Sequence, residues 1–204
     1  TDVTATFTCA DSLSGLAACA PPVTIATEGA NQAIPGAATD LAGNTATATT
    51  TANIDRTPPT LTPWFSPLPN AAGWNNTDVT VSFVVTDALS GVDSGGTTAP
   101  QTLTTEGPAQ IVTGAASDRA GNIGTTFASV SLDKTPPTLT ITEPESDGAL
   151  RRLPNLTVKG TALDDNLVNV VVNGADLGYA SSFEQVIPLV EGANSFTAVA
   201  NDIA

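Results

Sequence analysis

The chain has no histidine and no methionine, and its aromatic residues are six Phe, two Trp and one Tyr among 204 residues. Without histidine, a Ser–His or Cys–His catalytic pair is excluded, and Lys134 and Lys159 are the only amines available for lysine chemistry. Paired carboxylates can hydrolyse glycosides, but no acidic pair in this sequence stands in an aromatic setting. The sequence therefore predicts a chain that is not an enzyme.

Basic residues are scarce as well. Six Lys and Arg stand against twenty Asp and Glu, which gives a formal net charge of −14 and a pI of about 4.1. Nucleic acids and anionic membranes attract basic patches, so neither is expected as a partner. No apolar run reaches about 18 residues, so direct membrane insertion is not expected either, and no signal peptide is visible.

What the chain does have is an internal repeat. "TDVTATFTCADSLSG" at Thr1–Gly15 returns as "TDVTVSFVVTDALSG" at Thr77–Gly91, 76 positions later. "TEGANQAIPGAATDLAGN" and "TEGPAQIVTGAASDRAGN" are 78 positions apart, which places a two-residue insertion in a loop between the matching blocks. A weaker third copy, "EGANSFTAVANDIA", begins at Glu191. A period of about 75 to 80 residues predicts a series of small domains.

The pattern inside each repeat is that of β-strands. Val79, Val81 and Phe83 alternate with polar residues, a period of two that predicts one buried and one solvated face. No apolar periodicity of helix length is present, and Asn173-Gly174 is suited to a type I′ hairpin turn. Short strands separated by turn residues predict an all-β chain of antiparallel β-sandwiches.

These motifs also carry a family resemblance. "GWNNTDVTVSFVVTDALSGV", "TTEGPAQIVTGAASDRAGN" and "LDKTPPTLT" resemble the bacterial immunoglobulin-like (Big-type) repeats that occur in tandem in large secreted and cell-surface proteins, over Thr1 to about Lys134. From Thr135 onward, "LTVKGTALDDN" and "VVVNGADLG" resemble a sister type of bacterial immunoglobulin-like module that is often attached to extracellular glycan-active enzymes. The resemblance implies tandem immunoglobulin-like β-sandwiches, and it implies function only weakly.

Three domains follow from this reading. We expect residues 1–57 to form an immunoglobulin-like domain without its first strand, 58–134 a complete one, and 135–204 one of the second subtype without its last strand. Both incomplete domains would expose sheet edges. Two accounts stay open: neighbouring domains of a longer chain complete them, or the ends complete one another by strand addition in a filament.

The joints between these domains are short and contain proline. Pro58-Pro59 and Pro136-Pro137 favour extended backbone, and no Gly/Ser spacer separates one domain from the next. We therefore expect the domains to be arranged as an elongated rod.

Two cysteines indicate the compartment. Cys9 and Cys19 are ten positions apart. The second repeat has Val85 and Gly95 at the matching places, so it lacks both cysteines. The loss of both together favours a disulfide in the first repeat, and a disulfide that closes so short a loop would add roughly 2.5 to 3 kcal/mol to the stability of the fold. Two free buried thiols remain an alternative, whereas a metal or redox pair lacks further ligands. A disulfide implies an oxidising, extracellular location or the cell surface.

Acidic residues at the predicted joints are candidate calcium ligands. Asp55 lies between two domains, while Asp87 and Asp118 open loops that an immunoglobulin-like fold places at the same end. The first predicted set is therefore Asp55, Asp87 and Asp118. The same mapping puts a second set, Asp133, Asp164, Asp165 and Asp202, at the next joint. Ca²⁺ takes roughly 6 to 8 oxygen ligands, so we expect a structural Ca²⁺ at these joints.

A simpler interpretation of these acidic residues is also open. Arg56, Arg119 and Lys134 stand beside them, and aspartate is common in turns. Salt bridges and Asx-turns would then explain both sets without a metal ion. In the first repeat Asp11 and Asp40 correspond to Asp87 and Asp118, as the remnant of a similar site.

Two further features have alternatives. Trp64, Trp74 and Tyr179 could form a carbohydrate platform, although aromatic residues spaced singly in sandwiches usually pack in the core or at the rim. An intramolecular Lys–Asn isopeptide bond would need an Asn and an acid beside Lys134 or Lys159, and the sequence identifies neither partner.

Taken together, the sequence favours a non-catalytic spacer or stalk in a larger bacterial extracellular surface protein, adhesin or filament. The alternative is a glycan-binding or ligand-binding accessory module of a secreted enzyme. The expected partners are neighbouring domains of the same longer chain, or further copies in a filament.

Overall fold

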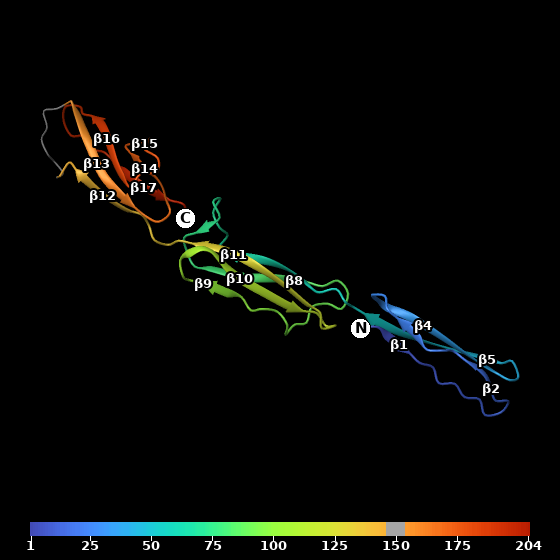
Figure 1. The fold of residues 1–204 in the computed structure, drawn as a ribbon. Helices are drawn as coiled ribbons and strands as arrows, with labels where there is room; N and C mark the ends of the chain where they lie inside the picture. The colour runs from blue at the N-terminus through green and yellow to red at the C-terminus, as the bar shows by residue number, and fades with distance from the viewer. Residues whose placement is uncertain (146–153) are drawn as a thin grey trace. The chain divides into compact units, whose positions relative to one another are not determined.

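The computed structural model describes residues 1–145 and 154–204 (Figure 1). Every regular element in these ranges is a β-strand, so the all-β prediction is confirmed. Within the same ranges, no helix is long and apolar enough to cross a membrane.

The first repeat contains five strands in two sheets. Their bounds are β1 (Val3–Ala5), β2 (Leu16–Cys19), β3 (Val23–Ile25), β4 (Gly29–Asp40) and β5 (Thr45–Ile54). β1 pairs with β3, and β4 lies between β2 and β5. The long hairpin of β4 and β5 forms because "DLAGN" turns the chain after Asp40, where the N–H of Gly43 donates to the Asp40 carbonyl at 3.1 Å.

The second repeat contains counterparts of four of these strands, and it has two additional strands. Its elements are β6 (Thr60–Ser66), β7 (Trp74–Asn75), β8 (Val79–Thr86), β9 (Gln101–Leu103), β10 (Gly107–Ser117) and β11 (Ile123–Leu132). The sheets have the orders β6-β8-β9 and β10-β11-β7. β8 to β11 correspond to β1 and β3 to β5, whereas β6 and β7 have no counterpart in residues 1–57.

Register shows how closely the two repeats agree. Thr4 is opposite Thr24 in the β1–β3 pair, and Thr80 is opposite Thr102 in the β8–β9 pair. The two threonine hydroxyls are hydrogen-bonded in both cases, at 2.8 Å and 2.9 Å. The period-two pattern predicted the strand at Val79, Val81 and Phe83, which is β8, because alternating side chains of a strand point to opposite faces of its sheet.

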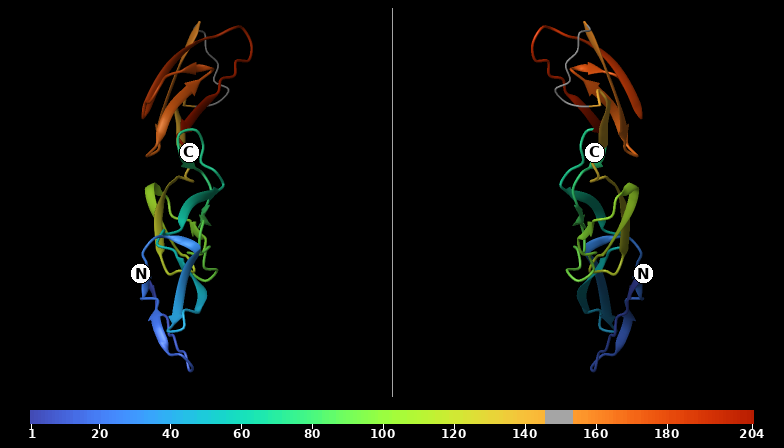
Figure 2. Two further views of the ribbon diagram at one scale, coloured as in Figure 1. Left: turned by 90° about the vertical axis from the view of Figure 1, so that its right-hand side faces the viewer. Right: turned by 90° about the vertical axis from the view of Figure 1, so that its left-hand side faces the viewer.

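The third module folds as two three-stranded sheets. Its strands are β12 (Thr138–Glu143), β13 (Asn155–Leu163), β14 (Leu167–Val172), β15 (Ala175–Asp176), β16 (Ser182–Pro188) and β17 (Ala198–Asp202), in the orders β12-β13-β16 and β15-β14-β17. Figure 2 shows these strands in orange and red as two facing layers. Val158, Val170, Val172 and Phe183 belong to the buried core of this module. Two layers around one apolar core are consistent with a β-sandwich.

Two local predictions are confirmed. Asn173 and Gly174 have φ values of 50° and 84°, as a type I′ turn requires, and they join the paired strands β14 and β15. Cys9 and Cys19 form a disulfide with an S–S distance of 2.08 Å and a Cα–Cα distance of 5.8 Å. The bond ties the segment after β1 to β2.

The described chain divides into two compact units. One contains Thr1–Trp64, Ser82–Pro100 and Thr113–Ala128, and the other contains Phe65–Val81, Gln101–Val112 and Ser129–Ala204. The boundary between the two units cuts through strands of the second repeat, so each unit contains part of that repeat. The three-domain boundaries remain a prediction from the sequence.

Candidate functional site

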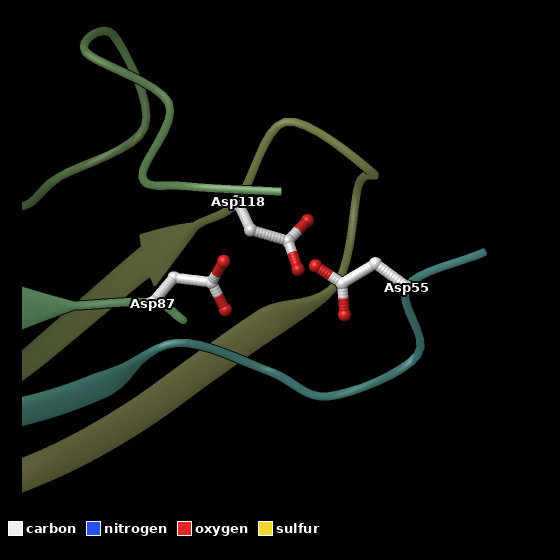
Figure 3. Close-up of side chains that lie close together, drawn as sticks. All are labelled: Asp55, Asp87 and Asp118. Atoms are coloured by element: carbon white, nitrogen blue, oxygen red, sulfur yellow. The ribbon is translucent and has the colours of Figure 1, made fainter. Parts of the chain in front are cut away.

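Asp55, Asp87 and Asp118 lie together although they come from three separate parts of the chain (Figure 3). Asp55 follows β5, Asp87 follows β8 and Asp118 follows β10. One carboxylate oxygen of each residue lies within 4.8 Å of the others. All three residues belong to the compact unit that begins at Thr1. We call them the aspartate cluster.

Local hydrogen bonds explain why the loops present their carboxylates here. Asp87 Oδ1 accepts hydrogen bonds from the N–H groups of Leu89 at 3.2 Å and Gly91 at 2.6 Å. Asp118 Oδ1 accepts from the Asn122 N–H at 2.8 Å, and its Oδ2 accepts from Asn122 Nδ2 at 2.6 Å. Aspartate forms such bonds to the backbone a few residues later, which closes the loop and holds the carboxylate in position.

Asp55 joins the linker to both loops. Its Oδ2 accepts a hydrogen bond from the Ser90 N–H at 2.8 Å, and its Oδ1 accepts one from the Thr57 N–H at 3.0 Å. Asn122 Nδ2 also donates to the Asp55 carbonyl oxygen at 3.2 Å. Each aspartate therefore uses part of its acceptor capacity within the protein, and the remaining lone pairs are free to accept further partners.

The surroundings of Asp55 favour the carboxylate form. Ser90 holds the pKa of Asp55 below its ordinary value of 3.8, first through its side chain, while burial acts in the opposite direction and the N–H groups of Ser90 and Thr57 add to the lowering. Ser90 Oγ is buried and has no hydrogen-bond partner among the described residues. Asp118 is only 3% exposed.

Among the residues that the structure describes, no basic side chain forms an ion pair with the cluster. The ion pairs within the described ranges are Arg56–Asp2, Lys134–Asp78 and Lys159–Glu143, and none of them reaches the three aspartates. The Asx-type bonds expected from the simpler interpretation are present. Of its basic residues, Arg56 pairs with Asp2 and Lys134 pairs with Asp78, and no ion pair of Arg119 with the three aspartates occurs among the described residues. Three close carboxylates repel one another unless a cation joins them.

The first repeat contains the two loops without the third carboxylate. Asp11 Oδ1 accepts from the Gly15 N–H at 2.7 Å, and Asp40 Oδ1 accepts from the Asn44 N–H at 2.8 Å. These bonds reproduce those of Asp87 and Asp118. The pKa of Asp11 is lowered first by the Gly15 N–H, and that of Asp40 is lowered first by the Asn44 side chain. The loop geometry thus forms without the linker residue.

The second predicted set is more loosely arranged. Asp133 is buried, and its Oδ2 accepts a hydrogen bond from Asn166 Nδ2 at 2.7 Å. Asp164 Oδ1 accepts from the Asn166 N–H at 2.7 Å, and Asp202 Oδ1 accepts from the Ala204 N–H at 3.0 Å. Within the described residues, only the first set brings three potential ligand atoms within 4.8 Å of one another.

Asp133, Asp164 and Asp165 instead line a cleft of about 610 Å³ together with Trp74 and Glu106. All lining residues of this cleft belong to one compact unit. Its lining combines one aromatic ring with four carboxylates and the amide of Asn166. Such a surface can stack against a ring and accept hydrogen bonds from hydroxyl groups.

The remaining candidates from the sequence are separate from one another. Trp64 and Tyr179 are 58% and 73% exposed, and neither lines the cleft that contains Trp74. Lys134 Nζ donates to Asp78 Oδ1 and to the Thr104 carbonyl oxygen, at 2.8 Å and 2.7 Å. Lys159 Nζ donates to Glu143 Oε1 at 3.3 Å.

Sequence reasoning missed the residues that orient the aspartates. Ser90, Asn122 and Asn166 each donate to an acidic residue of the linker that precedes their module. The repeated "SG" and "AGN" motifs mark Ser90 and Asn122 as recurring polar loop residues, but they do not reveal the bonds of these residues to Asp55. Asn166 belongs to neither motif.

Comparisons with known proteins identify similar segments in enzymes. A family model described as "Glucodextranase, domain B" matches residues 137–204. Bacillopeptidase F of Bacillus subtilis (strain 168) is 42% identical over 86 residues, which is 40% of this chain and 6% of that relative. The aligned segment is thus a small part of the length of this relative. Both similarities concern parts of the chain, and the resemblance of residues 1–134 to Big-type repeats stays a prediction.

Proposed function

We propose that this chain is a non-catalytic accessory segment of a larger secreted enzyme, whose β-sandwich modules space or position the catalytic part. The observation that carries this proposal is the similarity of residues 137–204 to domain B of glucodextranase. The similar segment in Bacillopeptidase F supports it, because the two names denote enzymes with different substrates. The feature that both enzymes share with this chain is therefore a similar accessory module, and not the ability to recognise one particular substrate.

These similarities favour an enzyme context over the stalk of an adhesin or filament. The Cys9–Cys19 disulfide supports secretion, since disulfides persist in oxidising surroundings. The partners of this segment are then the neighbouring domains of the same longer chain.

The experiment compares the full-length protein with a version that lacks these 204 residues. We expect kcat on a small soluble substrate to stay the same, and the rate on a polymeric or insoluble substrate to fall. The isolated 204-residue chain should hydrolyse neither α-glucans nor casein. Hydrolysis by the isolated chain, or flanking sequence that encodes no catalytic domain, would refute the proposal.

If the segment acts as a spacer, its modules should stand in a row, and we further propose that they form a tandem, elongated rod. The proline pairs Pro58-Pro59 and Pro136-Pro137 at the predicted joints support this, because proline restricts φ and favours extended backbone. Small-angle X-ray scattering of the full chain should give a maximum dimension of several module lengths, and a compact envelope would contradict the rod.

We also propose that the aspartate cluster binds Ca²⁺ as a structural ion. Three carboxylates with unused lone pairs, none of which forms an ion pair with a described basic residue, support this, and Ca²⁺ prefers oxygen ligands. Isothermal titration with CaCl₂ should give a dissociation constant of about 10⁻⁴ to 10⁻³ M, as in other extracellular modules. The loss of that binding in Asp118→Asn, with no loss in the matched Asp40→Asn, would assign the ion to this cluster. For the second set, Asp133, Asp164, Asp165 and Asp202, we propose weaker Ca²⁺ binding, because these residues are more loosely arranged.

A second candidate function, ligand binding, is favoured by the cleft at Trp74. An aromatic ring beside carboxylates and an amide suits a saccharide better than a hydrophobic ligand. A glycan array with the 204-residue chain tests this. Trp74→Ala should abolish any signal, whereas Trp64→Ala serves as the control because Trp64 is exposed outside the cleft. The absence of any signal would leave spacing as the only role.

A further inference from the structure

Two linkers of the chain contain the same kind of triplet, an aspartate, a basic residue and a threonine. Residues 55–57 read DRT and residues 133–135 read DKT, and two prolines follow each triplet. Both triplets lie between strands, and their basic residue and threonine are exposed. Exposed linkers are the usual sites of proteolytic cleavage, and a basic residue makes both cleavable by proteases that cut after Lys or Arg. We call these residues the linker triplets.

The threonine of each triplet is tied to a glutamate of the repeat that the chain is leaving. Thr57 Oγ1 donates a hydrogen bond to Glu28 Oε1 at 2.8 Å. Thr135 Oγ1 lies within hydrogen-bond distance of both carboxylate oxygens of Glu106, at 3.1 Å and 3.0 Å. Glu28 and Glu106 stand at the same place in the repeated "TEG" motif, so one contact occurs twice in the chain.

The basic residue of each triplet is tied to an aspartate of that same repeat. Arg56 forms an ion pair with Asp2, and Lys134 forms one with Asp78. Both aspartates belong to the repeated "TDV" motif. Lys134 Nζ also donates to the Thr104 carbonyl oxygen at 2.7 Å. A trypsin-like protease must place the basic side chain in its own acidic pocket, so these pairs compete with the protease for that side chain.

The aspartate of each triplet is tied to the repeat or module that the chain is entering. Asp55 Oδ2 accepts a hydrogen bond from the Ser90 N–H at 2.8 Å, and Asp133 Oδ2 accepts one from Asn166 Nδ2 at 2.7 Å. The other carboxylate oxygen of each aspartate accepts from the N–H of the threonine two residues later, at 3.0 Å and 3.1 Å. Each triplet is thus bonded both to the residues behind it and to those ahead of it.

A protease can cleave a triplet only after these bonds open together. It binds several consecutive residues of its substrate in extended form, and the bond to be cleaved lies between the basic residue and the threonine. In the second triplet both sides of this position are held, since Lys134 and Thr135 are each tied to a different acidic residue. All residues of the first set belong to one compact unit, and all residues of the second set belong to the other. Exposure alone is therefore not sufficient for cleavage, because local opening must break every one of these bonds.

We infer that the linker triplets protect the joints of this segment against endoproteases that cleave after Lys or Arg. Each triplet makes the cleavage of an exposed linker depend on the loss of contacts to both neighbours. An extracellular spacer meets such proteases, and a cut at a joint would separate its domains. The inference goes beyond the proposed spacer role, and it does not depend on which enzyme the segment belongs to.

The test follows trypsin cleavage of the full 204-residue chain by mass spectrometry, which assigns each cut to its residue. Initial rates are compared, so that a first cut elsewhere does not influence the result. The synthetic peptides NIDRTPPTLT and SLDKTPPTLT give the rate of each unfolded linker with its prolines. We expect the bonds after Arg56 and Lys134 to be cut roughly a hundredfold more slowly in the folded chain than in the peptides. Equal rates would overturn the inference.

Glu106→Ala and Glu28→Ala form a matched pair of variants. Glu106→Ala should raise the rate of cleavage after Lys134 by roughly tenfold and leave the rate after Arg56 unchanged, and Glu28→Ala should do the reverse. Cleavage after Arg119, between β10 and β11, reports opening of the second repeat as a whole and should not change in Glu106→Ala. An equal rise after Arg119 and Lys134 would mean that Glu106 only stabilises the repeat, and it would overturn the inference.

Two further variants separate the remaining bonds of the second triplet. Asp78→Asn should raise the rate after Lys134 only about twofold to fivefold, because the ion pair it removes is exposed. Asn166→Ala should raise it by roughly tenfold, because the variant frees Asp133 from the module ahead. If Glu106→Ala, Asp78→Asn and Asn166→Ala all leave this rate unchanged, the bonds of the triplet do not protect the joint and the inference is overturned.

Discussion

Val3 and Val79 occupy the same place in two copies of one motif, yet Val3 is 37% exposed and Val79 is fully buried at 0%. Their strands pair with β3 and β9 in the same register. The difference arises because the second repeat contains β6 and β7 and residues 1–57 contain no counterpart. Local sequence thus sets the pairing of strands within a repeat, whereas burial depends on which additional strand covers the sheet.

The largest effect expected from this comparison concerns one phenylalanine in each repeat. Phe83→Ala should destabilise the second repeat by roughly 3 to 5 kcal/mol, because it leaves a cavity in a closed core. Phe7→Ala should cost less than half as much, because Phe7 is only partly buried beside an open cavity. Chemical denaturation followed by hydrogen exchange in each repeat measures both. Equal losses would mean that the first core is closed in solution.

A second prediction exchanges the disulfide for the residues of the other repeat. Cys9→Val with Cys19→Gly reproduces Val85 and Gly95 of the second repeat. The first repeat should lose roughly 2.5 to 3 kcal/mol, because the ten-residue loop is no longer closed in the unfolded state. Calorimetry with and without reductant measures this loss, and reductant should have no further effect on the double variant. An unchanged melting temperature would show that the disulfide does not stabilise the uncovered sandwich.

A third prediction concerns the aspartate cluster. At calcium concentrations several-fold above the dissociation constant, binding should stabilise the unit that contains Asp55 by about 1 kcal/mol. Asp55→Ala should remove this response to calcium and to chelator. Asp11→Ala is the matched control, because its loop has the same hydrogen bonds without a third carboxylate. A thermal unfolding curve that is indifferent to calcium in the unaltered chain would favour the interpretation by Asx-turns alone.

The smallest expected effect is the loss of folding stability at acidic pH. The pKa values of Asp11, Asp40 and Asp55 are lowered in the folded chain, so the folded state favours the charged form of each. Their contribution to stability is therefore present above the ordinary value of 3.8 and is lost as the pH falls through the lower folded values. Asp40→Asn should reduce the slope of stability against pH below about 4 in the first repeat. An unaltered slope would contradict the assignment.

Part of the candidate site was predictable from sequence. Asp87 and Asp118 follow the ends of strands that alternation identifies, and the fold class places those ends together. The role of Ser90 and Asn122 was not predictable, because a hydrogen bond to Asp55 depends on the three-dimensional approach of the linker to two loops. The second set shares the same sequence pattern, but only the geometry shows that Asp133 bonds to Asn166 and that Asp164 and Asp165 line a cleft with Trp74.

The sequence by itself determined the all-β class, the alternating strand at Val79 to Phe83, the Asn173-Gly174 turn and the disulfide. Alternation, turn residues and the joint absence of two cysteines are local properties, so they can be read without knowing what lies nearby in space. Only the tertiary structure decided that Ala46 stays exposed while Gly124 is buried. Burial depends on a strand that comes from elsewhere in the chain, and the same local motif cannot record whether that strand is present.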